Sequence, residues 1–213
     1  MPSLVGSEMC IRDSEWLDWL VPLRDRLLDL LRERSRSLKA RLRDFLLVAG
    51  EAQQLLDSEN MAELAAFCTE SWAISTETDA GSDSWEAAAC RCLQDLEILE
   101  PDWLALLKQW EQAPELPSFA PQDPEKLERI AVYFAFRYLL KAVNDGDLLG
   151  RAQFCVLGVL VVERLSRFAG LPEALRLFSR EIEHNEDNLD ALLEHFWQTE
   201  GLSLPALLAA FNG

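Results

Sequence analysis

Apolar residues recur at intervals of three and four along almost the whole chain, which is the period of an amphipathic α-helix. No segment alternates apolar and polar residues as a half-buried strand would. Proline and glycine interrupt the helical pattern at Glu100-Pro101, at Asn144–Asp147 and at Gly170–Pro172. We therefore predict an all-α fold, an irregular multi-helix bundle of seven to eight helices.

Side chains that can cap helices predict where several of the helices begin. Ser35 or Ser37 can cap a helix over 38–56, and Asp147 can cap one over 148–168. Pro22 is expected to lie in the first turns of a helix over 16–34, or to bend it. The other expected helices cover 60–71, 85–110 with a break at 100–101, 125–143, 175–198, and a short segment after Ser203.

The chain is expected to contain one non-native segment and two helical subdomains. Residues 4–14, LVGSEMCIRDS, resemble one reading frame of a transposase sequencing adapter, so we set 1–14 aside. That resemblance implies that the chain is the tail of a longer protein and that Cys10 is not native. The rest is divided into an N-terminal subdomain over 15–112, a proline-rich linker over 113–124 and a C-terminal subdomain over 125–213.

Composition indicates a folded protein of the reducing cytoplasm. Apolar residues make up 49 % of the chain, which favours a packed core. The four remaining cysteines are scattered and make no disulfide framework, and no secretory signal is visible. The longest apolar run, Phe154–Val162, is far short of the roughly 20 residues that span a bilayer. We therefore expect no membrane association.

The net charge of −17 is unevenly distributed and limits the kinds of partner. Residues 16–48 carry +3, whereas residues 49–213 carry −18. Phosphate backbones are repelled by such an acidic surface, so nucleic-acid binding is not expected. A cationic partner, such as a lysine-bearing protein, would be attracted, although the same charge would also serve plain solubility.

The stretch 175–198, LRLFSREIEHNEDNLDALLEHFWQ, contains both histidines of the chain. On a continuous helix, Asn185 falls on the apolar face between Ile182 and Leu189, where its amide needs a hydrogen-bond partner. Glu181 and His184 share a different flank. We predict either a solvated polar edge or a site in which Glu181, His184 and Asn185 bind or orient something.

Arg137 is the second candidate position. It lies in the strongly apolar stretch RIAVYFAFRYLLK, beside Tyr133, Phe134 and Tyr138 on a helix surface. A guanidinium in this setting requires a carboxylate or an anionic ligand. The alternatives are a structural ion pair with Glu181, Glu183 or Asp147, or contact with a ligand.

No complete catalytic or metal-binding motif is present. Glu181-x-x-His184 has the spacing of a di-iron bundle ligand pair, but a second such motif is missing, so no metal is expected. Cys90 and Cys92 are two residues apart and point away from each other on a helix, which disfavours an iron–sulfur cluster in this segment. The chain has no glycine-rich phosphate loop and no recognisable nucleophile motif.

Three blocks, in order, are similar to the C-terminal half of the flagellin lysine-N-methylase family. They are PLRDRLLDLLRERSRSLKARLRDFLL (22–47), YFAFRYLLKAVNDGDLLGRAQFCVLGVLVVERL (133–165) and FSREIEHNEDNLDALLEHF (178–196). The string SREIEHNEDNL is the most specific part. Together the blocks cover a little under half of the native residues.

The resemblance implies a bacterial enzyme that methylates lysine side chains of flagellin, with S-adenosylmethionine as methyl donor. The family's iron–sulfur centre would belong to a cysteine-rich N-terminal part that this chain lacks, so the chain alone is expected to be inactive. Arg137, Arg180, Glu183, His184 and Asn185 match family-like positions. With Glu181, we expect them to connect the last helices, or to line a groove for flagellin or for the missing N-terminal part.

Two other functions stay open from the residues alone. The chain could be a non-enzymatic, acidic helical protein-interaction module, or a small metal-binding bundle. The coding sequence upstream of Glu15 separates the first alternative from the methylase, because a cysteine-rich segment there favours the enzyme. A metal assay tests the second.

Overall fold

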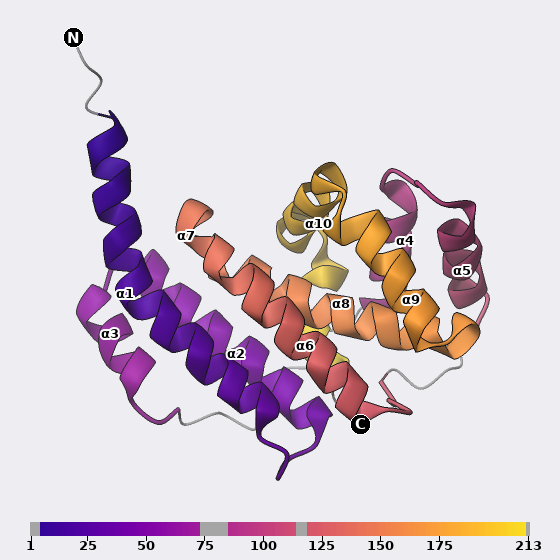
Figure 1. Ribbon diagram of the computed structural model, residues 1–213, viewed down its shortest axis with the longest axis horizontal. Coiled ribbons are helices and arrows are strands. Elements are labelled where there is room, and N and C mark those ends of the chain that lie inside the picture. Colours follow the sequence, from indigo (N-terminus) through magenta and orange to yellow (C-terminus); the bar gives the residue numbers. More distant parts are fainter. Residues whose placement is uncertain (1–4, 73–84, 114–118, 212–213) are drawn as a thin grey trace. The chain divides into compact units, whose positions relative to one another are not determined.

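The computed structural model describes residues 5–72, 85–113 and 119–211, with side chains from Leu17 onward. Every regular element in these residues is helical, which confirms the predicted all-α class (Figure 1). The predicted count of seven to eight helices is too low, because the stretches 125–143 and 175–198 are each interrupted. The polar, glycine-containing string TETDAGSDS predicts a loop over 76–84, and these positions lie outside the described residues.

The chain forms two compact units that are discontinuous in sequence. Unit 1 comprises Met1–Ile74 and Ala131–Ala152, and unit 2 comprises Ser75–Ile130 and Gln153–Gly213. Two helices, α6 (Pro124–Tyr138) and α8 (Leu148–Ala169), begin in one unit and end in the other. The predicted subdomains over 15–112 and 125–213 are consecutive in sequence, because composition and proline content vary along the chain and do not report which helices pack together.

Unit 1 is built on three helices: α1 (Val5–Arg32), α2 (Leu38–Asp57) and α3 (Met61–Thr69). The leucines of α1 at positions 20, 23, 27 and 31 are almost fully buried, as their helical spacing predicts. Ser37 is the N-cap of α2, since its hydroxyl accepts a hydrogen bond from the Ala40 amide. Helix α1 begins earlier than expected, so Pro22 lies in its interior and not in its first turns.

A tight turn in unit 1 joins α6 to α8. It contains the 3-10 helix η1 (Leu139–Lys141) and the short helix α7 (Ala142–Asp145), and it ends at Gly146 with φ of 76°. Asp147 caps α8 as predicted, because its carboxylate accepts the Gly150 amide at 2.8 Å. Gln53 of α2 secures the turn: its amide nitrogen donates to the Gly146 carbonyl at 3.0 Å, and its oxygen accepts the Leu149 amide.

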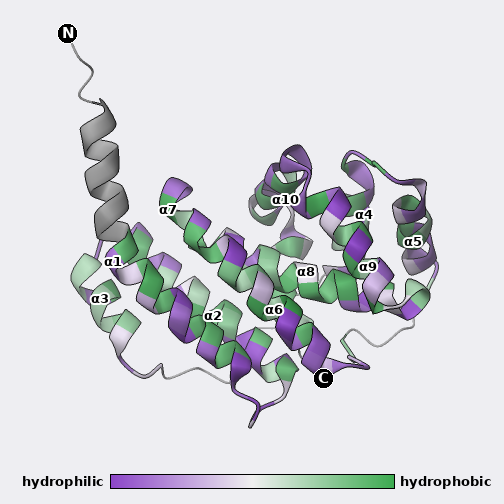
Figure 2. Ribbon diagram, in the orientation of Figure 1, coloured by the Kyte–Doolittle hydropathy of each residue, from purple (hydrophilic) through white to green (hydrophobic). Residues whose placement is uncertain are grey.

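Unit 2 surrounds the later part of α8, in which the stretch 154–162 is apolar and buried on all sides (Figure 2). Phe154 of α8 stacks on Phe178 with ring centres 6.2 Å apart, and Trp103 meets the same ring edge-on at 6.4 Å. The surrounding helices are α4 (Trp85–Asp95), α5 (Pro101–Glu111), α9 (Leu171–Phe178), the π-helix η2 (Ser179–Glu183), α10 (Glu186–Gln198), η3 (Glu200–Leu202) and α11 (Leu204–Ala209).

Two further expectations bear on unit 2. The predicted break at Glu100-Pro101 is confirmed, because α4 ends at Asp95 and α5 begins at Pro101. In the expected linker over 113–124, residues 114–118 lie outside the described part, while Phe119 is buried edge-on against Phe211 at 5.9 Å. No helix in the described residues is both long and apolar enough to cross a membrane.

Candidate functional site

The stretch expected to be one helix over 175–198 is three separate elements. Helix α9 ends at Phe178, the π-helix η2 follows, and α10 starts only at Glu186. The His184 amide donates to the Ser179 carbonyl at 3.0 Å, five residues earlier, which marks the wider π turn. The prediction of a continuous helix is therefore wrong. Single-turn π segments occur often at functional sites.

Asn185 is the N-cap of α10 and not a buried residue on a helical face. Its side-chain oxygen accepts the Asn188 amide at 3.2 Å, and its nitrogen donates to the Glu97 carboxylate at 3.2 Å. The hydrogen-bond partners that Asn185 was expected to need are therefore Asn188 of α10 and Glu97, which precedes α5. An asparagine followed by Glu186 and Asp187 in the first turn is a recognised helix start, and that signal could have located the break.

Glu181 faces the interior and is fully buried. Its two carboxylate oxygens accept the backbone amides of Leu99 at 2.9 Å and Glu100 at 2.7 Å. These amides directly precede α5, whose own N-cap position makes no side-chain cap. The Glu181 carboxylate therefore serves as a cap from a distant part of the chain, where negative charge at a helix N-terminus is favourable.

Asn188 completes the arrangement and was not a candidate from the sequence. Its side-chain nitrogen donates to the carbonyls of Glu97 and Glu181, both at 2.8 Å, while its oxygen accepts the Glu97 amide at 3.0 Å. Asn188 thus bonds both backbone groups of Glu97, as a neighbouring strand would. We call Glu181 and Asn188, with the α4–α5 connection (96–100) that they hold, the polar clamp.

The outer side of the π-helix lines a groove of about 640 Å³. Arg180 and His184 are exposed there, Leu99 contributes an apolar wall, and Arg176 and Ser179 complete the lining. Two of the predicted site residues, Arg180 and His184, therefore share one groove. Two others, Glu181 and Glu183, are buried and do not line it.

Two arginines in this groove form ion pairs with one carboxylate, that of Glu100. Arg176 donates through both terminal nitrogens to Glu100 at 3.2 and 3.0 Å, and Arg180 pairs with the same carboxylate at 2.7 Å. Hydrogen bonds from Arg176 lower the pKa of Glu100 and also of Glu173, and those to Glu173 and Glu100 raise the pKa of Arg176. The positive charges of Arg176 and Arg180 in the groove are therefore balanced by the carboxylates of Glu100 and Glu173.

The substitution Arg176→Met tests this ion-pair network through its pH dependence. We expect the pKa values of Glu100 and Glu173 to rise toward the ordinary value of 4.5 in carboxyl-resolved NMR titrations. A lowered carboxyl pKa stabilises the folded state only while the group is ionised. The destabilisation caused by Arg176→Met should therefore be largest above pH 4.5. It should disappear as the pH falls through the lowered pKa values of Glu100 and Glu173 in the parent protein. Arg129→Met on α6 should move neither pKa, and unchanged pKa values in Arg176→Met would contradict the assignment.

Arg137 belongs to a different unit from the other candidate residues. It belongs to unit 1, whereas Arg180, Glu181, Glu183, His184 and Asn185 belong to unit 2. The Arg137 Nε donates to the Tyr138 hydroxyl at 3.2 Å, and its guanidinium lies 5.6 Å from the centre of that ring. Tyr138, one of the neighbours predicted from the sequence, is therefore the hydrogen-bond partner of Arg137.

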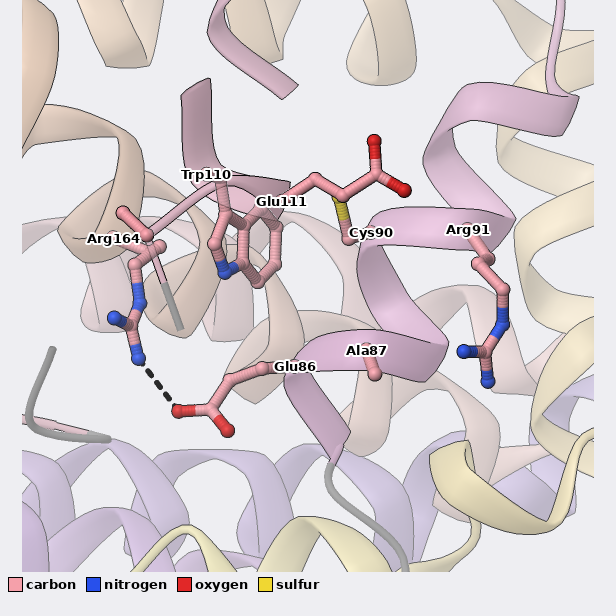
Figure 3. Close-up of a pocket in the computed structure, with 8 residues that line it drawn as sticks. Glu86, Ala87, Cys90, Arg91, Trp110, Glu111 and Arg164 are labelled. Atoms are coloured by element: carbon pink, nitrogen blue, oxygen red, sulfur yellow. Dashed lines mark hydrogen bonds and ion pairs between the residues drawn. The ribbon is translucent and has the colours of Figure 1, made fainter. Parts of the chain in front are cut away.

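A second, smaller cavity of about 180 Å³ lies in unit 2 between α4, α5 and α8 (Figure 3). Arg164, 1 % exposed, donates to Glu86 at 2.6 Å across it. Burial lowers the pKa of Arg164, and the Glu86 charge opposes that shift. Cys90 also lines the cavity, and its thiol accepts a hydrogen bond from Gln94 at 3.2 Å.

The described cysteines are buried thiols without the features of nucleophiles. Burial raises the pKa of Cys90, that of Cys68 to about 11 and that of Cys92 to about 12. A raised pKa keeps a thiol protonated near neutral pH, which suppresses its reactivity. Among the residues that the structure describes, no group of three or more histidine, cysteine or acidic side chains is placed to hold a metal ion.

Comparison of the chain with protein-family models, with curated proteins and with solved structures gives no significant match. Chemically, the polar clamp fixes the position of α5, and the groove above it presents Arg180 and His184 to solvent.

Proposed function

We propose that this chain is the C-terminal helical region of a bacterial, cytoplasmic flagellin lysine-N-methylase-like protein. The full protein would transfer methyl groups from S-adenosylmethionine to lysine side chains of flagellin. The donor site and the iron–sulfur cluster would belong to a cysteine-rich part outside this chain. In this proposal the chain contributes a helical scaffold and not the reacting groups.

The observation that supports the proposal is the role of the residues that carry the resemblance. In the string SREIEHNEDNL, Glu181, Asn185 and Asn188 each bond the α4–α5 connection or cap α10. These side-chain roles set the string apart from a leucine-rich helix, whose apolar residues can be exchanged for one another with little cost. The other two blocks include the buried Leu23, Leu27 and Leu31 of α1 and most of α8.

The test uses the longer product encoded around this chain. Incubated with monomeric flagellin and S-adenosylmethionine carrying a labelled methyl group, it should place label on flagellin lysines, as peptide mass spectrometry would show. The chain alone should transfer none. Absence of labelling by the longer product would overturn the proposal, and labelling by the chain alone would show that the catalytic part is misplaced.

The non-enzymatic interaction module is the second candidate, and the charge of unit 2 favours it. Unit 2 contains 22 acidic and 8 basic residues, whereas unit 1 contains 15 and 12. The acidic excess is thus concentrated in one unit, where a cationic partner would be attracted. A module of this kind would bind a basic protein without modifying it.

A further inference from the structure

The cavity between α4, α5 and α8 has a buried inner wall and an exposed opening, both within unit 2 (Figure 3). The inner wall is formed by Cys90, Trp110 and Arg164, which are all buried. Arg91 and Glu111 lie at the opening and are exposed. A molecule that enters the cavity from solvent therefore contacts an indole, a thiol and a guanidinium at its inner end.

The size of the cavity limits what it can hold. Its volume is about 180 Å³. An engineered protein cavity of about 150 Å³ holds a benzene molecule, whereas sites for drug-sized ligands start at about 300 Å³. The cavity therefore fits a single ring or a short alkyl chain, and it is too small for a nucleoside.

The buried guanidinium of Arg164 indicates the charge of the ligand. Stability alone does not require this group, because replacing a buried ion pair by apolar side chains of similar volume is often neutral or stabilising. The neighbouring Glu163–Arg167 ion pair is formed within α8, whereas Arg164 extends across the cavity to Glu86 of α4 (Figure 3). The parallel N–H donors of a guanidinium match the two oxygens of a carboxylate. The cavity therefore favours a carboxylate over a neutral group.

Glu86 now occupies the place that the carboxylate of a ligand would take. Its carboxylate accepts a hydrogen bond from a terminal nitrogen of Arg164 at 2.6 Å. The Glu86 side chain is 24 % exposed and can turn toward solvent, whereas Arg164 is 1 % exposed and cannot. Glu86 also lies in the first turn of α4, where its negative charge stays favourable once it is hydrated. An incoming carboxylate can therefore replace Glu86 at the guanidinium without leaving either charge unsolvated.

We propose that this cavity is a binding site for a small monocarboxylic acid whose apolar body is a single ring or a short alkyl chain. The ligand carboxylate accepts hydrogen bonds from Arg164 in place of Glu86, and the apolar body packs against the Trp110 indole and the Cys90 thiol. A phosphate ester is disfavoured, because its second negative charge would be repelled by Glu86 and Glu111. The site goes beyond the methyl transfer proposed above and does not depend on it.

The test measures binding of benzoate to the intact chain by NMR, through the indole N–H signal of Trp110. Benzoate should shift this signal and saturate it at millimolar concentrations. Benzamide has the same shape and no charge. It should bind about tenfold more weakly or less tightly still, because it lacks the charge-assisted hydrogen bonds to Arg164.

Three variants separate the site from a general effect of charge. Glu86→Gln removes the competing carboxylate and should strengthen benzoate binding about tenfold. The control Glu125→Gln makes the same exchange at an exposed position of α6 and should change the affinity less than about twofold. The double variant Glu86→Gln/Arg164→Met removes both charges of the buried pair together, so the fold should be retained. It should bind benzoate no better than benzamide.

Each outcome decides for or against the site. Equal affinity of the unmodified chain for benzoate and benzamide, or a benzoate preference that persists in the double variant, would remove Arg164 from the site. Equal strengthening by Glu86→Gln and Glu125→Gln would show a response to net charge and contradict the exchange at Arg164. No shift of the Trp110 signal at millimolar benzoate would overturn the proposal. Flagellin methylation by the longer product is a separate readout, so either proposal can fail without the other.

Discussion

Replacing Asn188 by aspartate is expected to lower the free energy of unfolding of unit 2 by about 3–5 kcal/mol at neutral pH. Asn188 is 3 % exposed and donates two hydrogen bonds, to the carbonyls of Glu97 and Glu181. The substitution keeps the shape of the side chain but sets a buried carboxylate oxygen against these two carbonyl oxygens. Urea unfolding followed by tryptophan fluorescence measures the loss.

The penalty of Asn188→Asp should depend on pH in a defined direction. Repulsion by two carbonyls and burial both raise the pKa of the introduced carboxyl in the folded state above its unfolded value of about 3.9. The folded state then binds the proton more tightly, so the deficit is full above the raised pKa and shrinks as the pH falls toward about 4. Asp190→Asn, an exchange of the same two groups at an exposed position of α10, should change stability by less than about 0.5 kcal/mol. A deficit that did not vary with pH would contradict this account.

Replacing Glu181 by alanine is expected to cost about 2–4 kcal/mol, because two backbone amides before α5 lose their acceptor and a buried cavity is left. Glu181→Gln should cost less, since one oxygen remains to accept one of the two amides. Native-state hydrogen exchange resolves the effect residue by residue: the Leu99 and Glu100 amides should lose protection first.

Two comparisons make the Glu181 prediction specific. Glu186→Ala removes the same charge five residues away at an exposed position and should cost less than about 1 kcal/mol. Glu181→Ala combined with Asn188→Ala should be less destabilising than the sum, because both side chains hold the same connection. Full additivity, or a loss below 1 kcal/mol for Glu181→Ala, would show that the polar clamp does not act as a unit.

The helical boundaries that depend on neighbouring residues were predictable. Ser37 and Asp147 cap the helices that they precede, and the break before Pro101 occurs where the proline indicated. These signals work because a capping side chain bonds an amide only two or three residues away. Asn185 carries the same kind of signal, but the apolar period continued across it, and the π turn of η2 shifted the helical register.

The candidate site was predictable in position but not in geometry. The helical spacing of polar residues predicted a site at Glu181, His184 and Asn185. It did not predict that Glu181 is buried while His184 is exposed. The partners in the α4–α5 connection lie more than 80 residues earlier in the chain. A helical wheel contains no information about contacts at that separation.

The sequence by itself determined that the chain is helical, where several helices begin, and which faces are apolar, because these properties depend on residues within about four positions of one another. Only the tertiary structure decided that the chain forms two discontinuous units and that Glu181 and Asn188 hold the start of α5. The physical reason is that a buried polar group must find a partner wherever packing places one. That partner is selected by the whole fold and not by the neighbouring sequence.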